Sequence, residues 1–282
     1  MKLVRWGEAG AERPGLLDKA GAVRDLSAHI DDIDGAALAP AALDRLRALD
    51  PDSLPPAPAG ARLGSPVTRI PTFHCVGLNY RKHAAEVGAE PPAEPILFVK
   101  TASALAGPFD PLTIPKDSAK TDWEVELGVV IGQVTEHVSE AEALSRVAGY
   151  CVVNDVSERE WQQERGGTWS KGKGAPGFGP TGPWLVTADE VPDPQALDLW
   201  TDLNGQRVQH SNTSDMIFSV AQIVSYMSRM MRLLPGDVIA TGTPSGVGAG
   251  MKPQRFLRSG DVLEMGVQGL GAQRVEARAW TG

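Results

Sequence analysis

Residues 123–131 read WEVELGVVI, a stretch with the two-residue periodicity of a β-strand. In a strand, Glu124 and Glu126 would project from one face, and the alternate apolar side chains from Trp123 to Ile131 would project from the other. The acidic pair could belong to a solvated sheet face, or its parallel carboxylates could hold one hard divalent cation. The apolar surroundings favour the cation, because an unpaired buried carboxylate is costly.

Strand-like runs recur on both sides of this stretch from about residue 70 onward. They are short, rich in Val and Ile, and bounded by Gly, Pro, Asn and Asp: TFHCVGL, ILFVK, VAGYCVVNDV, PWLVT, DLWTDLNGQRV, GDVIATG and DVLEMGV. Helical patterns are few, and the longest, residues 216–231, predicts a helix with a methionine-rich packing face. Many short strands with scattered helices predict a strand-dominated α+β fold, not a doubly wound parallel sheet.

The beginning of the chain has a different character. The runs LVRW, GLLD and AVRDL and a helical stretch at 36–48 predict a small N-terminal α+β domain over residues 1–50. Residues 51–69 begin PDSLPPAPAGARLGSP, and this proline-rich composition predicts an extended linker. Residues 70–282 would then form the larger domain.

The composition excludes several classes of function. Asp and Glu number 35 against 27 Lys and Arg, which gives a formal charge of −8. An acidic chain argues against nucleic acid and against a polybasic membrane contact. The sequence shows no apolar signal region and no window near the roughly 18 apolar residues of a membrane span, so we expect a cytoplasmic protein. Cys75 and Cys151 lie in apolar runs and predict buried thiols.

A third carboxylate comes from residues 152–157, VVNDVS. Asp155 stands at the exit of an apolar strand, where ligands are commonly supplied, although Asp155 or Ser157 could instead cap a following helix. Together with Glu124 and Glu126, Asp155 makes an all-oxygen donor set. Such a set selects Mg²⁺, Mn²⁺ or Ca²⁺ over zinc, which prefers His and Cys.

Two further motifs supply an acid–base pair and a lysine. In NYRKHAAEVG, His83 and Glu86 would share a helix face, so that the carboxylate orients the imidazole as a general base; an exposed polar pair is the alternative. The glycine-rich run at 166–183 carries Lys173 and fits GxxxxGK. We reject a nucleotide-binding loop there, because Gly174 replaces the required Ser or Thr and prolines prevent a following helix.

A fifth motif follows the strand GDVIATG within residues 233–248. Its Gly, Pro, Thr and Ser residues could offer hydroxyl and backbone N–H groups to an anion, or could form only a tight turn. Taken together and in order, GLNYRKHAAEVG, WEVELGVVIG, VNDVSERE, the lysine of GKG and LLPGDVIATGTPSGVG resemble the fumarylacetoacetate hydrolase family over residues 70–270. The likeness extends to members that hydrolyse acylpyruvates and 2,4-diketo-3-deoxy sugar acids.

The resemblance implies a mixed β-roll or sandwich that forms a homodimer or higher homo-oligomer and holds one Mg²⁺ or Mn²⁺. It assigns the metal ligands to Glu124, Glu126 and Asp155. It assigns the catalytic positions to His83 and Glu86, on a lid helix, and to Lys173. Positions that face substrate in the family are matched by Arg159, Gln162 and Thr243.

The implied activity is hydrolysis of a C–C bond in a 2,4-diketo acid, of the rhamnonate- or fuconate-derived type, to pyruvate and a hydroxy acid. A decarboxylase of oxaloacetate-type acids, a keto–enol isomerase and a non-catalytic carboxylate-binding protein are the alternatives. Many family members read Lys-Ser-x-Asp-Thr at the lysine, whereas this chain reads Gly-Ala-Pro-Gly at 174–177 after it. We therefore expect specificity for the distal end of the substrate to come from the lid helix and from contacts with residues 174–177.

Overall fold

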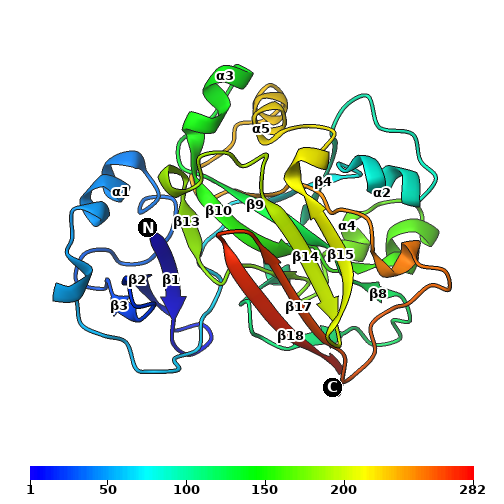
Figure 1. The fold of residues 1–282 in the computed structure, drawn as a ribbon, viewed down its shortest axis with the longest axis horizontal. Helices are drawn as coiled ribbons and strands as arrows, with labels where there is room; N and C mark the ends of the chain where they lie inside the picture. The colour runs from blue at the N-terminus through cyan, green and yellow to red at the C-terminus, as the bar shows by residue number, and fades with distance from the viewer.

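The computed structural model describes all 282 residues and contains two large β-sheets (Figure 1). The larger sheet has the strand order β3-β2-β1-β13-β10-β9-β16-β4-β5, and only β16 and β4 run parallel within it. Its strands are β1 Lys2–Trp6, β2 Arg13–Leu17, β3 Val23–Asp25, β4 Phe73–Gly77, β5 Ile96–Lys100, β9 Val125–Ile131, β10 Val147–Asn154, β13 Leu185–Thr187 and β16 Val238–Ala240.

The smaller sheet has the order β15-β14-β17-β18-β7. Its strands are β7 Leu112–Ile114, β14 Asp198–Leu203, β15 Gln206–Asn212, β17 Val262–Val267 and β18 Gly271–Ala279. Two short pairs join β8 Thr121–Asp122 to β11 Ser157–Glu158 and β6 Leu105–Ala106 to β12 Gly179–Pro180. The helices are α1 Pro40–Arg47, α2 Arg81–Glu86, α3 Glu140–Ala143, α4 Ser170–Lys173 and α5 Val220–Ser228. The predicted strand-dominated α+β fold is therefore confirmed.

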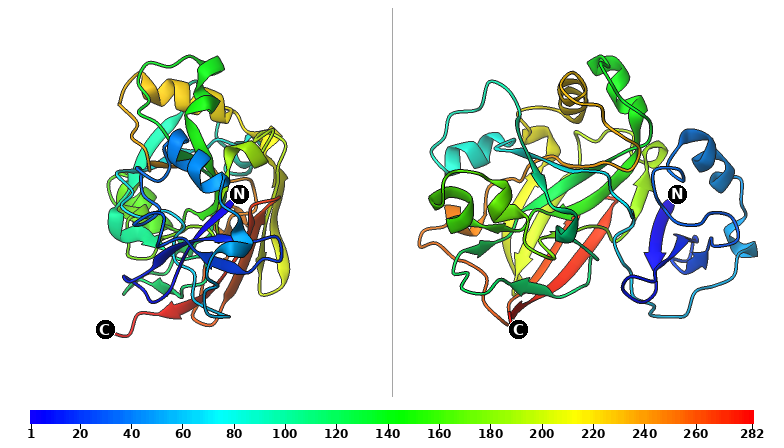
Figure 2. Two further views of the ribbon diagram at one scale, coloured as in Figure 1. Left: turned by 90° about the vertical axis from the view of Figure 1, so that its left-hand side faces the viewer. Right: turned by 180° about the vertical axis from the view of Figure 1, so that it is seen from behind.

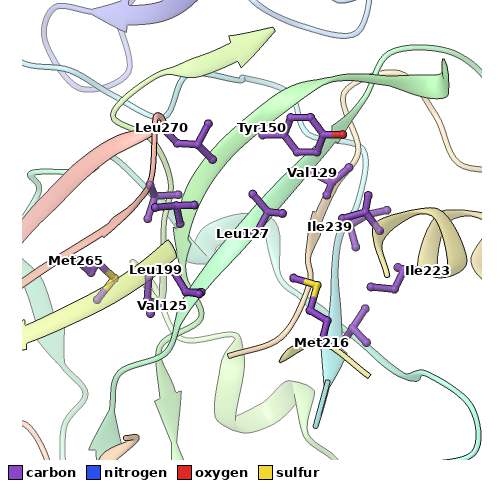
Figure 3. Close-up of a cluster of buried hydrophobic side chains, with 14 of the residues drawn as sticks. Val125, Leu127, Val129, Tyr150, Leu199, Met216, Ile223, Ile239, Met265 and Leu270 are labelled. Atoms are coloured by element: carbon purple, nitrogen blue, oxygen red, sulfur yellow. The ribbon is translucent and has the colours of Figure 1, made fainter. Parts of the chain in front are cut away.

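The main hydrophobic core lies between the two sheets, and β9 forms its centre (Figure 3). Val125, Leu127 and Val129 of β9 share this cluster with Leu199 and Met265 of the smaller sheet. The intervening side chains of β9 must then point to the opposite face, as the two-residue periodicity predicts. That opposite face is where the acidic pair lies.

The N-terminal strands extend the larger sheet. Leu3 of β1 is paired with Leu185 of β13, and both belong to a second hydrophobic cluster on the outer face of the sheet. Helix α1 begins at Pro40, whose missing N–H is not needed in a first helical turn, and covers that cluster. The segment 51–69, predicted to be an extended linker, contacts the N-terminal strands through isolated bridges that join Arg24 to Pro56 and Trp6 to Leu63.

Two expected elements differ from the structure. The run at 198–208 is a hairpin of β14 and β15, because Asn204 and Gly205 take positive φ angles of 52° and 78° and close a two-residue turn. Helix α5 starts at Val220, not at residue 216. Ser219 is the N-cap residue of this helix and forms a capping box with Gln222. The Ser219 hydroxyl accepts a hydrogen bond from the Gln222 N–H at 3.2 Å, and the Gln222 side chain accepts one from the Ser219 N–H at 2.9 Å.

Helices α2 and α4 lie near each other at the end of the molecule opposite the N-terminal strands, in front and rear views alike (Figures 1 and 2). Helix α2 follows β4 after a short connection, and α4 packs against β5. The β4–β5 edge of the larger sheet therefore carries both helices beside the acidic face of β9. None of the helices combines the length and the apolar character that crossing a lipid bilayer requires.

Candidate metal and substrate site

Three carboxylates converge where β9 and β10 meet. The antiparallel register places Asn154 opposite Val125, so Asp155 comes beside Glu124, and its N–H donates to the Glu124 carbonyl at 2.9 Å. One carboxylate oxygen from each of Glu124, Glu126 and Asp155 lies within 4.8 Å of the others. All three side chains are buried, so the acidic pair on β9 is not part of a solvated sheet face.

Neither of the two candidate caps closes a helix. Ser157 is the first residue of β11, and its hydroxyl donates to the Asp155 carbonyl at 2.9 Å. The Asp155 carboxylate accepts hydrogen bonds from Lys100 and Lys173 instead. Asp155 therefore belongs to the acidic cluster, and the capping alternative is wrong.

Burial and mutual repulsion disfavour full ionisation of the three carboxyl groups. Burial raises the pKa of Glu126 well above its usual range, and the charges of Asp155 and Glu124 raise it further. Burial also opposes ionisation of Glu124, but the Lys173 ammonium and the Arg159 guanidinium outweigh it and lower the Glu124 pKa to about 2. A divalent cation beside Glu126 would relieve this repulsion, and three carboxylate oxygens suit Mg²⁺ or Mn²⁺.

Two buried lysines balance part of the negative charge. Lys173 Nζ, on α4, donates to Glu124 at 2.6 Å and to Asp155 at 2.8 Å. Burial opposes its charge, but these carboxylates raise the Lys173 pKa overall. Lys100, at the end of β5, donates to the other Asp155 carboxylate oxygen and to the Val156 carbonyl at 3.1 Å. Sequence reasoning missed Lys100; the only signal was a lysine that ends an apolar strand.

Replacing Lys100 by methionine should destabilise the metal-free protein by about 3–5 kcal/mol, because it leaves a buried carboxylate short of one partner. Urea unfolding in the presence of a chelator measures this loss. Added Mg²⁺ or Mn²⁺ should recover part of it, since the ion supplies positive charge to Asp155. The exposed Lys19→Met exchange is the matched control, expected within about 0.5 kcal/mol of the parent. An equal loss in both variants would contradict a charge-balancing role for Lys100.

His83 and Glu86 form a contact on α2 beside the acidic cluster. His83 Nδ1 lies 2.9 Å from Glu86 Oε2, and His83 is only 8% exposed, so the pair is not an ordinary surface pair. The other Glu86 oxygen accepts a hydrogen bond from the Gly246 N–H at 2.8 Å, which ties α2 to the loop after β16. A carboxylate at Nδ1 keeps the proton of neutral imidazole on that atom and leaves Nε2 as the base.

Arg159 and Gln162 lie next to the cluster, on the segment after β11. The Arg159 guanidinium donates to Asp122 at 2.8 Å, to Glu124 at 2.7 Å and to Gln162 at 3.1 Å. Its Nη2 is buried without a partner, which favours an anion at this position. Sequence reasoning also missed Asp122. Its carboxylate accepts further hydrogen bonds from the N–H groups of Gly248 and Ala249, at 2.7 and 3.0 Å.

Thr243 lies on the loop after β16, and its hydroxyl is engaged within the protein. It donates to the Val125 carbonyl at 2.9 Å and accepts from Gln209 at 2.9 Å. The preceding Gly242 has a φ of 104°, a conformation that favours glycine, and its N–H donates to Glu126 at 2.7 Å. This loop therefore holds the Glu126 carboxylate in place through the Gly242 N–H.

The predicted site residues, apart from Glu86, line one cavity of about 210 Å³. Residues 174–177, which we expect to contact the distal end of the substrate, do not line it. The Gly174 carbonyl accepts a hydrogen bond from the Thr101 hydroxyl at 2.7 Å, and the Gly177 N–H donates to the Ser103 carbonyl at 3.1 Å. These bonds hold the segment against the chain that follows β5, so that expectation is wrong.

Comparisons with known proteins identify the family of this chain. The model of the fumarylacetoacetate (FAA) hydrolase C-terminal region matches residues 72–277. A Burkholderia ambifaria protein, whose name assigns it provisionally to the hydrolases, is 58% identical over 279 residues, which are 99% of each chain. The chain belongs to the fumarylacetoacetate hydrolase family, as its motifs predict.

Solved structures of enzymes share the whole fold. A fumarylacetoacetate hydrolase from Exiguobacterium antarcticum is 34% identical with a TM-score of 0.86, and the match covers 99% of this chain and 100% of that one. A 5-carboxymethyl-2-hydroxymuconate delta-isomerase from Mycobacterium smegmatis is 31% identical with a TM-score of 0.79, over the full length of both chains. A maleylpyruvate hydrolase from Sphingobium sp. SYK-6, solved with manganese(II) and pyruvate, is 26% identical with a TM-score of 0.81, again over both full lengths.

Proposed function

We propose that this protein is a metal-dependent hydrolase that splits a 2,4-diketo acid into pyruvate and a second carboxylic acid. The observation that carries the proposal is the placement of His83, which contacts Glu86, and of Lys173 in one cavity with the buried acidic cluster. The manganese and pyruvate of the Sphingobium enzyme support a divalent ion and a small keto acid as ligands here. A homodimer or higher homo-oligomer, expected from the family resemblance, is part of the proposal.

Glu124, Glu126 and Asp155 would hold the ion, which when bound supplies Lewis-acid stabilisation of negative charge on the keto-acid oxygens. Arg159 Nη2 is free to bind the substrate carboxylate. Lys173 uses two of its three N–H donors on carboxylates and keeps the third for a substrate oxygen. These two cations orient the keto-acid end of the substrate in the buried part of the cavity.

The proposed reaction balances with one water molecule. His83 Nε2 takes a proton from water, whose oxygen bonds to carbon 4, and Glu86 stabilises the imidazolium that forms. The bond between carbons 3 and 4 then breaks, and its electron pair stays on carbon 3. His83 returns the proton to carbon 3, which leaves pyruvate. The released acyl group carries the water oxygen in its new carboxylate.

A second candidate, keto–enol isomerisation, is favoured by the full-length similarity to the Mycobacterium smegmatis isomerase. It would use the same ion site and His83 without attack by water. The decarboxylase of oxaloacetate-type acids also needs no such attack. A non-catalytic carboxylate-binding protein is less favoured, because it has no need for the buried His83–Glu86 pair.

One experiment separates these functions. The protein is incubated with 2,4-diketo acids, the sugar-derived type included, and with oxaloacetate, in H₂¹⁸O with Mg²⁺ or Mn²⁺, and products are identified by mass. Hydrolysis gives pyruvate and an acid with one ¹⁸O in its new carboxylate, decarboxylation gives carbon dioxide, and isomerisation leaves the mass unchanged apart from solvent exchange. The same mixtures with chelator measure the dependence on metal. Pyruvate release without ¹⁸O incorporation into the partner acid would overturn the hydrolase proposal.

A further inference from the structure

The cavity has an apolar wall on its solvent side. Phe98 on β5 and Trp169 at the start of α4 meet edge to face, with ring centroids 5.4 Å apart. Both rings line the cavity and are partly exposed, whereas the acidic cluster is buried, so the pair belongs to the more open part of the cavity lining. The remaining apolar side chains that line the cavity are Val76, Leu78, Val87, Ala89, Ile96, Val247 and Ala249.

The backbone leaves space for this wall. A Cβ atom on Gly77 would come within 2.1 Å of the Trp169 ring, so the indole rests directly on the main chain at the end of β4. Any larger residue at this position would push Trp169 away from Phe98. The aromatic pair is therefore fixed by a close contact with the sheet and does not depend on a loose loop conformation.

Phe98 also touches the reacting end of the site. The Lys173 ammonium lies 5.1 Å from the Phe98 ring centroid and contacts the Glu124 and Asp155 carboxylates. A keto acid held by Lys173 and Arg159 would therefore extend its distal group toward Phe98 and Trp169. The wall is in the right place to contact the part of the substrate that differs between 2,4-diketo acids.

The positively charged side chains that line the cavity lie only at its buried end. The cations that line it, Arg159 and Lys173, both contact Glu124 at the buried end. A second carboxylate on the distal group would meet no cation at the Phe98–Trp169 wall. At the wall a polyhydroxylated distal group would find only the Trp169 indole N–H as a side-chain hydrogen-bond partner, which is unfavourable for several hydroxyls that leave water.

We propose that the Phe98–Trp169 wall selects 2,4-diketo acids whose distal acyl group is apolar, either alkyl or aryl. This inference rests on the proposed hydrolase function and narrows its substrate class. It makes the sugar-derived diketo acid, expected from the sequence, a disfavoured substrate. It also assigns specificity to two residues that the family motifs do not include.

The test compares three synthetic substrates that share the pyruvate end and differ in the distal group: pentanoyl, polyhydroxylated pentanoyl and carboxylated pentanoyl. We expect the wild-type protein to prefer the pentanoyl compound by about 10–200-fold in kcat/KM, the range for small differences in apolar contact. Trp169→Ala should lose about tenfold or more on that compound and little on the other two. Trp169→Leu should keep part of the preference, since it keeps an apolar side chain.

Inhibition by pyruvate distinguishes an effect of Trp169 on the distal group from an effect on the reacting end of the site. Because pyruvate has no distal group, its inhibition constant should stay the same in the Trp169 variants. Trp280→Ala, at a half-exposed tryptophan near the C-terminus and absent from the cavity lining, is the matched control and should change neither quantity.

Equal or better cleavage of the hydroxylated or carboxylated compound would overturn the inference and leave the hydrolase proposal intact, since pyruvate would still be released. Failure to cleave any of the three overturns the hydrolase proposal instead. In that case calorimetric binding of the same compounds tests the inference about the Phe98–Trp169 wall. Tighter binding of the pentanoyl compound that is lost in Trp169→Ala supports the inference, and equal binding of all three compounds overturns it.

Discussion

Exchange of Glu126 for glutamine is expected to remove metal-dependent activity and metal-dependent thermal stabilisation together. The exchange keeps the shape of the side chain and replaces one of the three proposed carboxylate ligands by a neutral amide. Loss of a ligand should lower activity by more than about 100-fold, because changes to outer groups around metal sites already cost 10–100-fold. The parent should gain about 2.7 kcal/mol of stability at an ion concentration 100 times its Kd, and the variant should gain almost none.

The metal-free variant should not be less stable than the metal-free parent. Burial and the neighbouring carboxylates raise the Glu126 pKa above that of the unfolded chain. A carboxyl with a raised folded-state pKa contributes stability at low pH, and that stability is lost as the pH rises through the folded-state pKa. Glutamine does not ionise, so the variant should not lose stability in this way. Thermal melts with chelator and with Mg²⁺ or Mn²⁺ test both parts. The exposed Glu8→Gln exchange is the control. Full activity of the chelated parent would exclude an essential ion.

Exchange of His83 for alanine should lower kcat by about 10²–10⁴-fold, the contribution of a general base, without a change in metal affinity. The imidazole contacts Glu86 and is not one of the three carboxylate ligands. Steady-state kinetics and metal titration followed by thermal shift provide the two measurements. His29→Ala, at an exposed histidine that is distant in sequence from His83, controls for the removal of an imidazole as such.

Two outcomes would change the assignment of His83. Pyruvate release at the parent rate would make the residue structural and favour decarboxylation, which needs no base for water. A simultaneous loss of metal affinity would show that α2 supports the ion site directly. Glu86→Gln should give a smaller loss than His83→Ala, because the amide oxygen can still accept from either Nδ1 or the Gly246 N–H, whereas Glu86 serves both.

The acidic cluster was predictable because its signals are local. The alternation at 123–131 places Glu124 and Glu126 on one face, and an Asn-Asp exit marks Asp155 on the next long strand. What remained open was whether that face is buried. Burial depends on β4, β5 and α4, which come from distant parts of the chain, so only the fold could exclude a solvated strand.

The residues missed from the sequence share a different property, which is that only long-range packing gives them a role. Lys100 ends an edge strand, where a lysine normally faces water, and it is buried only because Asp155 comes from β10. Trp169 lies in a glycine-rich run that resembles a loop, and Gly77 gives it a place in the wall. Likewise β1 joins the larger sheet through a pairing with β13 that no local pattern indicates.

The loop from Gly246 to Ala249 connects helix α2 with Arg159, which are far apart in the sequence. Glu86 of α2 holds the Gly246 N–H, while Asp122 holds both the Gly248 and Ala249 N–H groups and the Arg159 guanidinium. The docking of α2 and the orientation of the arginine therefore depend on the same four residues of backbone. Thermodynamic linkage requires reciprocity: if an anion at the arginine favours the docked helix, the docked helix tightens the anion by the same factor. Under that condition, substrate capture and positioning of the His83–Glu86 pair would form a single cooperative step.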